Sequence, residues 1–213
     1  MIEKIFEEFP KITIVDKPEF RGNPLVKYLN SASENFLKPA IKDSNNLLFK
    51  SSAGQTNWAG VPWVAVLDPL ATDTIQDGHY ITYLFSADME RVYLNLNQGI
   101  TKILEEFKSD AKNELFRRAE ILRRRVPEYK KFFDCTKLDL SADLVKSFRP
   151  KNYEYGIAFG KEYRRGSLPS EQELISDINN MVYLYAISIS EGGTDMELAG
   201  EDFKPESFDN DKD

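Results

Sequence analysis

Between residues 47 and 97 the apolar positions follow the patterns of β-strands. Leu47–Lys50 and Val61–Leu67 are short apolar runs, and Tyr80–Phe85 is rich in aromatic and β-branched residues. Arg91–Asn97 alternates apolar and polar side chains with a period of two. Because short turns such as Gln76-Asp77-Gly78 join these strands, we expect them to pair antiparallel.

Apolar residues spaced three and four positions apart predict helices on both sides of these strands. The first predicted helix is Ile2–Glu8. The second begins at Asn23, a favourable N-cap, with Pro24 in the first helical position. The longest predicted helix, Thr101–Val126, ends before Pro127, which cannot continue it.

The C-terminal third of the chain gives weaker signals until residue 170. Ser170 and Glu173 form a capping box that begins the last helix. Lys137–Leu140 is expected to be a further strand, and Tyr155–Phe159 fits either a helix or a strand. These elements predict an α+β fold, with residues 1–190 forming a single domain. In this domain a mostly antiparallel, twisted central sheet is flanked by helices.

The net charge of −7 belongs entirely to the C-terminus. Residues 191–213 contain two basic and nine acidic residues, so their charge is 2 − 9 = −7, whereas residues 1–190 carry 26 of each sign. With Gly192-Gly193 and few apolar residues, the segment 191–213 is expected to be an acidic disordered tail or a linker. The acidic total therefore does not exclude DNA binding by the neutral body.

A basic cluster lies at the end of the longest predicted helix. Residues 117–131, RRAEILRRRVPEYKK, contain seven basic and two acidic residues. Such a cluster creates a local positive field that attracts phosphates. The candidate phosphate contacts are Arg117, Arg118, Arg123, Arg124, Lys130 and Lys131. The alternative is an ordinary solvated helix face.

Few kinds of catalytic site are compatible with this composition. The single cysteine, Cys135, excludes an internal disulfide and a Cys-rich zinc site, and the single histidine, His79, excludes mechanisms that need two. Neither a phosphate-binding P-loop, a dinucleotide fingerprint nor a nucleophile elbow is present. We therefore expect no metal, no cofactor and no catalysis by this chain alone. One alternative is a metal-dependent nuclease site built on Asp110, Glu128 and Lys130.

No apolar run in the sequence approaches the roughly 20 residues that cross a bilayer. The N-terminal residues lack the basic and apolar regions of a secretory signal. A cytoplasmic location is therefore expected.

The segment 51–101 concentrates residues suited to a planar, hydrogen-bonding ligand. Trp63 and Tyr80 offer stacking surfaces in adjacent strands. The amides Asn95, Asn97 and Gln98, on the following strand, could read the edge of a nucleobase. The alternative is that these side chains simply pack in the core, as aromatic residues in strands usually do.

Three strings in this segment carry a family resemblance: SSAGQTNWAGVPWVAVLD, GHYITYLFS and ERVYLNLNQGIT. Together with the later NYEYGI, YRRGSLP and ELISDINNMVYLY, they resemble the MrcB-like N-terminal domain family over roughly residues 20–190. This family comprises the DNA-binding N-terminal domains of McrB-type modification-dependent restriction systems. The resemblance implies recognition of double-stranded DNA that carries a modified, usually methylated, base.

The resemblance also implies a mechanism, in which the modified base is flipped out of the duplex into a pocket. The pocket walls correspond to Trp63, Tyr80 and Leu84, and a loop enters or holds the duplex. The loop residues are Gly54, Gln55, Thr56, Asn57 and Trp58.

The expected partner is a GTP-hydrolysing motor or a nuclease, present as a further domain or a subunit. The alternatives are DNA binding without modification specificity and a protein-interaction role in a defence system.

Overall fold

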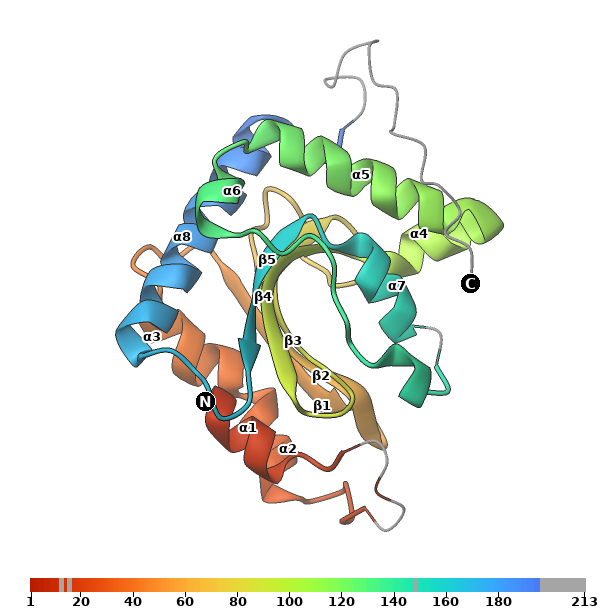
Figure 1. Cartoon of the computed structure of the whole chain (residues 1–213), viewed down its shortest axis with the longest axis vertical. Coiled ribbons are helices and arrows are strands. Elements are labelled where there is room, and N and C mark those ends of the chain that lie inside the picture. Colours follow the sequence, from red (N-terminus) through yellow and green to blue (C-terminus); the bar gives the residue numbers. More distant parts are fainter. Residues whose placement is uncertain (12–13, 15–16, 148, 196–213) are drawn as a thin grey trace.

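The structure is a computed structural model that describes all residues except 12–13, 15–16, 148 and 196–213. Its centre is a five-stranded sheet in which every neighbouring pair is antiparallel and the strand order follows the chain (Figure 1). The strands are β1 (Leu48–Gly54), β2 (Trp58–Leu67), β3 (His79–Phe85), β4 (Arg91–Gln98) and β5 (Phe159–Arg164). The predicted α+β fold with an antiparallel sheet is confirmed.

Helices surround this sheet, and their bounds follow local signals in several places. The α-helices are α1 (Ile2–Glu8), α2 (Pro24–Asn30), α3 (Lys38–Ala40), α4 (Ile100–Phe107), α5 (Ala111–Arg125), α6 (Tyr129–Phe132), α7 (Arg149–Gly156) and α8 (Glu171–Ser190). Shorter helical segments are η1 (Ser33–Leu37), η2 (Lys108–Asp110) and η3 (Ala142–Leu144). The predicted N-cap Asn23 accepts a hydrogen bond from Leu25 N, and the capping box at Ser170 is present.

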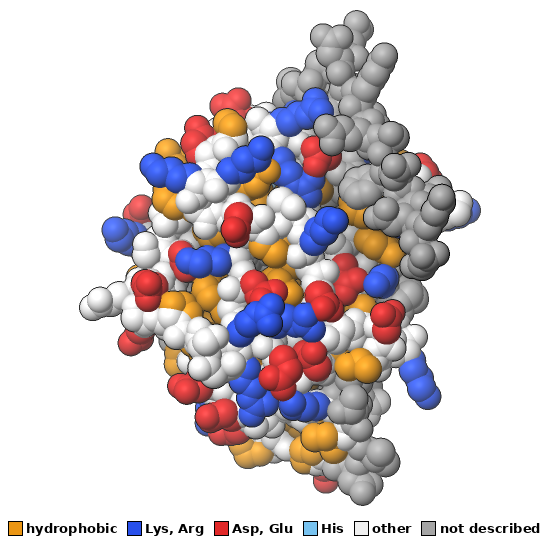
Figure 2. All heavy atoms as spheres, in the orientation of Figure 1, with side chains coloured by type: hydrophobic (Ala, Val, Ile, Leu, Met, Phe, Trp, Pro, Cys, Tyr) orange, Lys and Arg blue, Asp and Glu red, His pale blue; other side chains and the backbone are white. Residues whose placement is uncertain are grey.

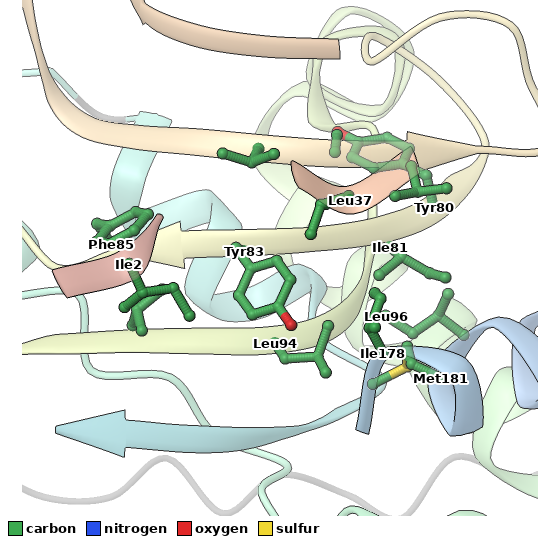
Figure 3. Packing of buried hydrophobic residues seen from close by; sticks show 14 of the residues in the cluster. Ile2, Leu37, Tyr80, Ile81, Tyr83, Phe85, Leu94, Leu96, Ile178 and Met181 are labelled. Carbon is green, nitrogen blue, oxygen red and sulfur yellow. The ribbon is translucent and has the colours of Figure 1, made fainter. Parts of the chain in front are cut away.

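One face of the sheet carries the main hydrophobic core. Ile81, Tyr83 and Phe85 alternate along this face of β3, where Phe6 of α1 packs edge-to-face on Phe85 with ring centroids 5.4 Å apart. Ile178 and its neighbours on α8 cover the same face (Figure 3). Burial of this face by helices near both ends of the chain leaves the other face for the candidate site.

The opposite face is more polar and is covered by α7 and the segment before it. Strand register pairs Trp63 with Leu84 and Leu84 with Tyr93, so these side chains share this face. Leu138 and Leu140 pack on them in a second, smaller cluster. The segment that covers this face, which includes Leu138, Leu140 and α7, lies about 40 or more positions after β4 in the sequence. Distant parts of the chain therefore form this side of the sheet.

Two predictions of secondary structure were wrong. The helix expected over Thr101–Val126 is divided into α4 and α5 at Lys108, whose backbone has a positive φ of 49° with a ψ of −112° and so cannot continue a helix. Lys137–Leu140 is not a strand, since only Cys135 in this region forms an isolated bridge to the sheet, at Gly160. The fifth strand is β5, which the sequence pattern did not predict.

Candidate nucleic-acid interface

A cavity of about 150 Å³ lies between the polar face of the sheet, α7 and the start of α4, and we call it the sheet cavity. Its apolar and aromatic walls come from Trp63, Ile75, Tyr80, Leu84, Ile100 and Tyr153. Its polar lining comes from Gln55, Gln76, Thr82, Asn97, Thr101 and Arg149. A cavity of about this size in another protein binds benzene, so there is room for one six-membered ring.

Hydrogen bonds fix the aromatic walls. Tyr80 is buried, and its hydroxyl donates to the carbonyl oxygen of Ile75 at 2.8 Å. Tyr153, on α7, is hydrogen-bonded to Arg149 one helical turn earlier. Burial raises the pKa of both tyrosines above the usual phenol value, so both hydroxyls stay protonated at neutral pH. The rings therefore present neutral, oriented surfaces to the cavity.

The polar wall is also held in place. Asn97 donates through Nδ2 to the carbonyl oxygen of Tyr153 at 3.1 Å, which ties β4 to α7. Thr82 donates through Oγ1 to Asn95 Oδ1 at 3.2 Å. Because that hydroxyl proton is used internally, the Thr82 oxygen can face a ligand only as an acceptor. Gly156 allows the close approach of α7, since a Cβ there would lie 2.5 Å from Asn97 Oδ1.

Two of the predicted base-pocket residues do not line the cavity. Asn95 is fully buried, and its Nδ2 donates to the carbonyl oxygens of Thr82 and Tyr93. Gln98 is also buried, and its Nε2 donates to the carbonyl oxygens of Leu115 and Gly156. Both amides hold neighbouring backbone in place, which leaves Trp63, Tyr80, Leu84 and Asn97 of the predicted set at the cavity.

The predicted DNA loop is the turn between β1 and β2, and it lies at the rim of the cavity. Gln55, Thr56 and Asn57 are exposed, and Gln55 lines the cavity. Gly54 has φ 128°, and a Cβ there would lie 1.9 Å from Asn57 O, so the turn needs glycine at this position.

Trp58, at the end of this turn, packs against the N-terminal segment of the chain. Its Nε1 donates to the carbonyl oxygen of Pro18 at 2.7 Å. Its ring makes edge-to-face contacts with Phe9 and Phe20, with centroids 5.1 and 5.3 Å away. Trp58 therefore anchors the turn to the N-terminal segment instead of extending from it.

The basic cluster of residues 117–131 does not form one surface. Arg117 and Arg118 both form ion pairs with the buried carboxylate of Glu114. These pairs hold the pKa of Glu114 below its usual value despite the opposing effect of burial, which is the largest single cause. Arg123 donates to the carbonyl oxygens of Ala158 and Ile157. These three arginines have roles inside the fold.

The remaining cluster members lie elsewhere. Arg124 and Lys130 line a separate groove between α5 and α7, and Lys131 lies over the ring of Phe132 at 5.4 Å from its centroid. None of the six predicted phosphate contacts lines the sheet cavity. The six basic residues are close in sequence, but the structure places them in different environments, so they do not form a single phosphate-binding surface.

Three cations that the sequence pattern did not single out lie at the cavity or beside the β1–β2 turn. Arg149 lines the cavity directly. Lys17 and Arg21, with Glu19 between them, line a separate recess against Thr56 and Asn57 of the β1–β2 turn. Arg149 lies more than 120 positions after Lys17 and Arg21 in the sequence, so no local signal could have grouped it with them.

The nuclease alternative has no geometric support. Asp110 precedes α5 and Glu128 follows it, and a 15-residue helix is about 22 Å long. The two carboxylates therefore cannot share a metal ion. Among the residues that the structure describes, no three His, Cys, Asp or Glu side chains are grouped closely enough to hold one.

Comparison with known families identifies the family of the chain. The model of the MrcB-like N-terminal domain family matches residues 4–189, and the chain belongs to this family. The class is that of the DNA-binding module of McrB-type restriction systems, which work with further domains or partners. No curated protein and no solved structure matches the chain. Within the described ranges, no helix is long and apolar enough to span a membrane.

Proposed function

We propose that this domain recognises modified DNA by accepting an extruded base in the sheet cavity. The observation that carries the proposal is that three predicted pocket walls, Trp63 of β2 and Tyr80 and Leu84 of β3, line one cavity of about 150 Å³. A flipped base needs stacking surfaces and a few polar groups at its edge. Tyr153 adds a third aromatic wall from α7.

The size of the cavity favours a single-ring base. A pyrimidine has one six-membered ring, whereas a purine has two fused rings and needs a larger space. A methyl group adds about 0.8 kcal/mol when it is buried, which corresponds to roughly fourfold in affinity. Burial of the methyl group alone thus supports only modest discrimination, and shape must supply the rest. We therefore propose a methylated cytosine as the preferred base.

The rim of the cavity supports contact with the DNA backbone. The exposed β1–β2 turn carries Gln55 next to the cavity, with Arg149 lining the cavity and Lys17 and Arg21 lining the separate recess. Cations beside a turn that enters the duplex would meet the phosphates flanking the extruded base. In this proposal the duplex docks on the β1–β2 turn, and α5 does not contact it.

In this proposal the chain has no catalytic role of its own. Its described residues contain no grouped metal ligands, and the family is a recognition module of multidomain systems. The nucleotide hydrolysis or DNA cleavage would then come from another domain or subunit. A cytoplasmic location is proposed with it, since that is where such a module meets DNA.

The test is a titration of otherwise identical duplexes. One carries 5-methylcytosine, one 5-hydroxymethylcytosine, one N6-methyladenine, and one is unmodified, and each is measured at two salt concentrations. We expect the tightest binding to the 5-methylcytosine duplex. Equal affinity for all four would contradict modification recognition and favour plain DNA binding.

Variants of the cavity complete this experiment. Trp63→Ala removes a stacking wall, and Thr101→Trp fills the cavity from its rim while leaving the sheet intact. Both should remove the preference for the modified duplex. Tyr183→Ala is the matched control, because Tyr183 is a 61% exposed aromatic residue on α8. If Thr101→Trp folds and keeps the full preference, the base does not enter this cavity.

A further inference from the structure

A second and larger hollow, of about 750 Å³, lies between α5 and α7, and we call it the α5–α7 groove. Helix α7 separates it from the sheet cavity. Successive residues of an α-helix are rotated by about 100°, so Lys151 and Tyr155, which line the groove, lie on roughly the opposite side of α7 from Arg149 and Tyr153. The two hollows are therefore separate sites.

The groove is strongly positive. Its two acidic residues are both neutralised by lining residues, Glu120 by Arg123 and Glu154 by Lys151, the latter pair at 3.2 Å. Three further cations line it: Arg124 from α5, Lys130 from α6 and Lys137 from the following segment. All three are exposed, and they leave the groove with a net charge of +3.

Aromatic rings form part of the same wall. Phe116 and Tyr155 are half-buried neighbours, with ring centroids 5.4 Å apart. The ammonium group of Lys112 lies 4.9 Å from the centroid of the Tyr155 ring and makes a cation–π contact with it. The face seen in Figure 2 carries α5, α6 and α7, and it shows patches of hydrophobic surface among Lys and Arg side chains, with Asp and Glu side chains interspersed. Positive charge and aromatic faces thus occur together.

We propose that the α5–α7 groove is a second nucleic-acid site, which binds a short run of single-stranded DNA. Cations that track phosphates beside aromatic platforms for bases are the combination that single strands need. In a duplex the bases already stack on one another, so Phe116 and Tyr155 would have no base to contact. An acidic peptide would satisfy the charges but leave the aromatic wall unused.

This inference rests on the proposed function only in taking the chain to be a DNA-binding module. It predicts that single-strand binding and modification preference are separable, because they use opposite sides of α7. Fluorescein-labelled (dT)12 tests the groove. A blunt 5-methylcytosine duplex tests the cavity, and the same duplex with a (dT)12 overhang tests whether the two sites act on one molecule.

The first variant is Lys130→Glu/Lys137→Glu, which reverses two charges of the groove. Its matched control is Lys27→Glu/Lys42→Glu, which changes two exposed lysines outside both hollows. The groove variant should bind (dT)12 at least tenfold more weakly. Because each lost phosphate contact flattens the dependence of log affinity on log salt by about 0.7, its slope should fall by about 1.4. The control should stay within twofold of the parent.

The second variant, Tyr155→Leu, keeps an apolar side chain but removes the ring. We expect at least fivefold weaker binding of (dT)12 with an unchanged salt slope, since a stacking contact releases no counterions. Melting temperatures verify that both variants fold. Both should retain the parent's preference ratio for the 5-methylcytosine duplex.

Several results would overturn the inference. Among them are failure of the parent to bind (dT)12, equal losses in the groove variant and its control, and loss of blunt-duplex binding in parallel with (dT)12. Binding of a ten-residue polyglutamate that is sensitive to the groove variant, with (dT)12 unaffected, would assign the groove to an acidic peptide. If modification preference is absent but (dT)12 binding depends on the groove, the proposed base recognition fails and this inference stands.

Discussion

His79, the single histidine, connects β3 to the end of α8. The residue is buried, its Nε2 lies 3.2 Å from Ser188 Oγ, and its ring packs edge-to-face on Tyr185. Gly193 approaches the ring so closely that a Cβ there would lie 2.8 Å from His79 Cε1. Burial, aided by the charge of Arg125, lowers the pKa of His79 to about 4. The folded protein therefore holds a neutral imidazole at physiological pH.

This shift predicts a pH dependence of stability. Because the unfolded chain has the ordinary pKa of 6.5, it binds more protons than the folded chain between pH 6.5 and about 4. The stabilisation is complete above pH 6.5 and is lost as the pH falls toward 4, reaching a loss of about 2 kcal/mol at pH 5. Urea denaturation of the parent and of His79→Gln from pH 7 to 4.5 measures it. Parallel pH profiles for the two proteins would exclude His79 as the cause.

Gln98 gives a second prediction at the residue scale. Its Nε2 supplies the hydrogen bonds of two buried carbonyl groups, those of Leu115 and Gly156, while its own Oε1 is buried without a partner in the described part of the chain. Gln98→Leu keeps the volume of the side chain but leaves the carbonyl groups of Leu115 and Gly156 without this hydrogen-bond donor. It also removes the unpaired Oε1 of Gln98. We expect a net loss of about 2 kcal/mol in urea denaturation. Gln172→Leu, at an exposed position of α8, should change stability by less than about 0.5 kcal/mol.

At the scale of elements, the division between α4 and α5 decides how the candidate interface is covered. The apolar stripe runs across the break at three- and four-residue steps, so the pattern alone predicted one helix. The break allows Ile100 and Ile103 of α4 to pack on Ala111 and Leu115 of α5. Lys108 carries the conformational cost, since its φ of 49° is unfavourable for a residue with a Cβ.

Lys108→Gly should therefore stabilise the protein. Glycine reaches positive φ without steric conflict, and relief of the strain exceeds the extra entropy that glycine has in the unfolded chain. We expect a gain of about 0.5–1 kcal/mol in thermal or urea unfolding relative to Lys108→Ala, which keeps the Cβ. A glycine variant no more stable than the alanine variant would show that the turn is unstrained.

The missed strand β5 has a physical explanation at the same scale. Phe159 and Tyr163 are the only large side chains of this strand that are buried. The sequence that follows Phe159, GKEYRR, is mostly polar, so it lacks the apolar pattern of a strand. Gly160 is needed because a Cβ there would lie 2.6 Å from the carbonyl oxygen of Leu94. Pairing with β4 supplies the hydrogen bonds that define the strand, and that partner lies more than 60 positions earlier.

At the scale of the whole molecule, the two ends of the chain close the main core. Helix α1 buries Ile2, Ile5 and Phe6 against the sheet face that α8 also covers. The N-terminal amine lies close enough to Glu171, at the start of α8, for the two charges to interact, although burial is the larger effect and lowers its pKa (Figure 1). The main hydrophobic core and the candidate interface thus lie on opposite faces of one sheet.

Phe6→Ala tests this separation. Removal of a fully buried aromatic side chain should cost about 3–4 kcal/mol and lower the melting temperature, because a cavity is left in the core. The folded fraction should bind DNA with the parent's affinity, since Phe6 lies on the other face from the sheet cavity. Glu7→Ala, exposed on the same helix, is the control. A change in DNA affinity of the folded Phe6→Ala protein would contradict the separation of the two faces.

The sequence alone determined the features that depend on neighbouring residues. Strand periodicity placed Tyr80 and Leu84 on one face, and the caps at Asn23 and Ser170 were correct because a cap involves residues only two or three positions apart. The ordered motifs also identified the family over most of the chain. Folding changes neither the spacing of neighbouring residues nor the order of motifs, so the linear chain carries both in full.

The tertiary structure alone decided which side chains meet. It placed Asn97 at the sheet cavity but used Gln98 to hold backbone, although the two are adjacent in sequence. It also brought Tyr153 and Arg149 to the cavity and separated the basic residues of α5 into different environments. Such contacts join residues tens of positions apart, and competition among many partners for burial and hydrogen bonds selects them. A local pattern carries no record of that competition.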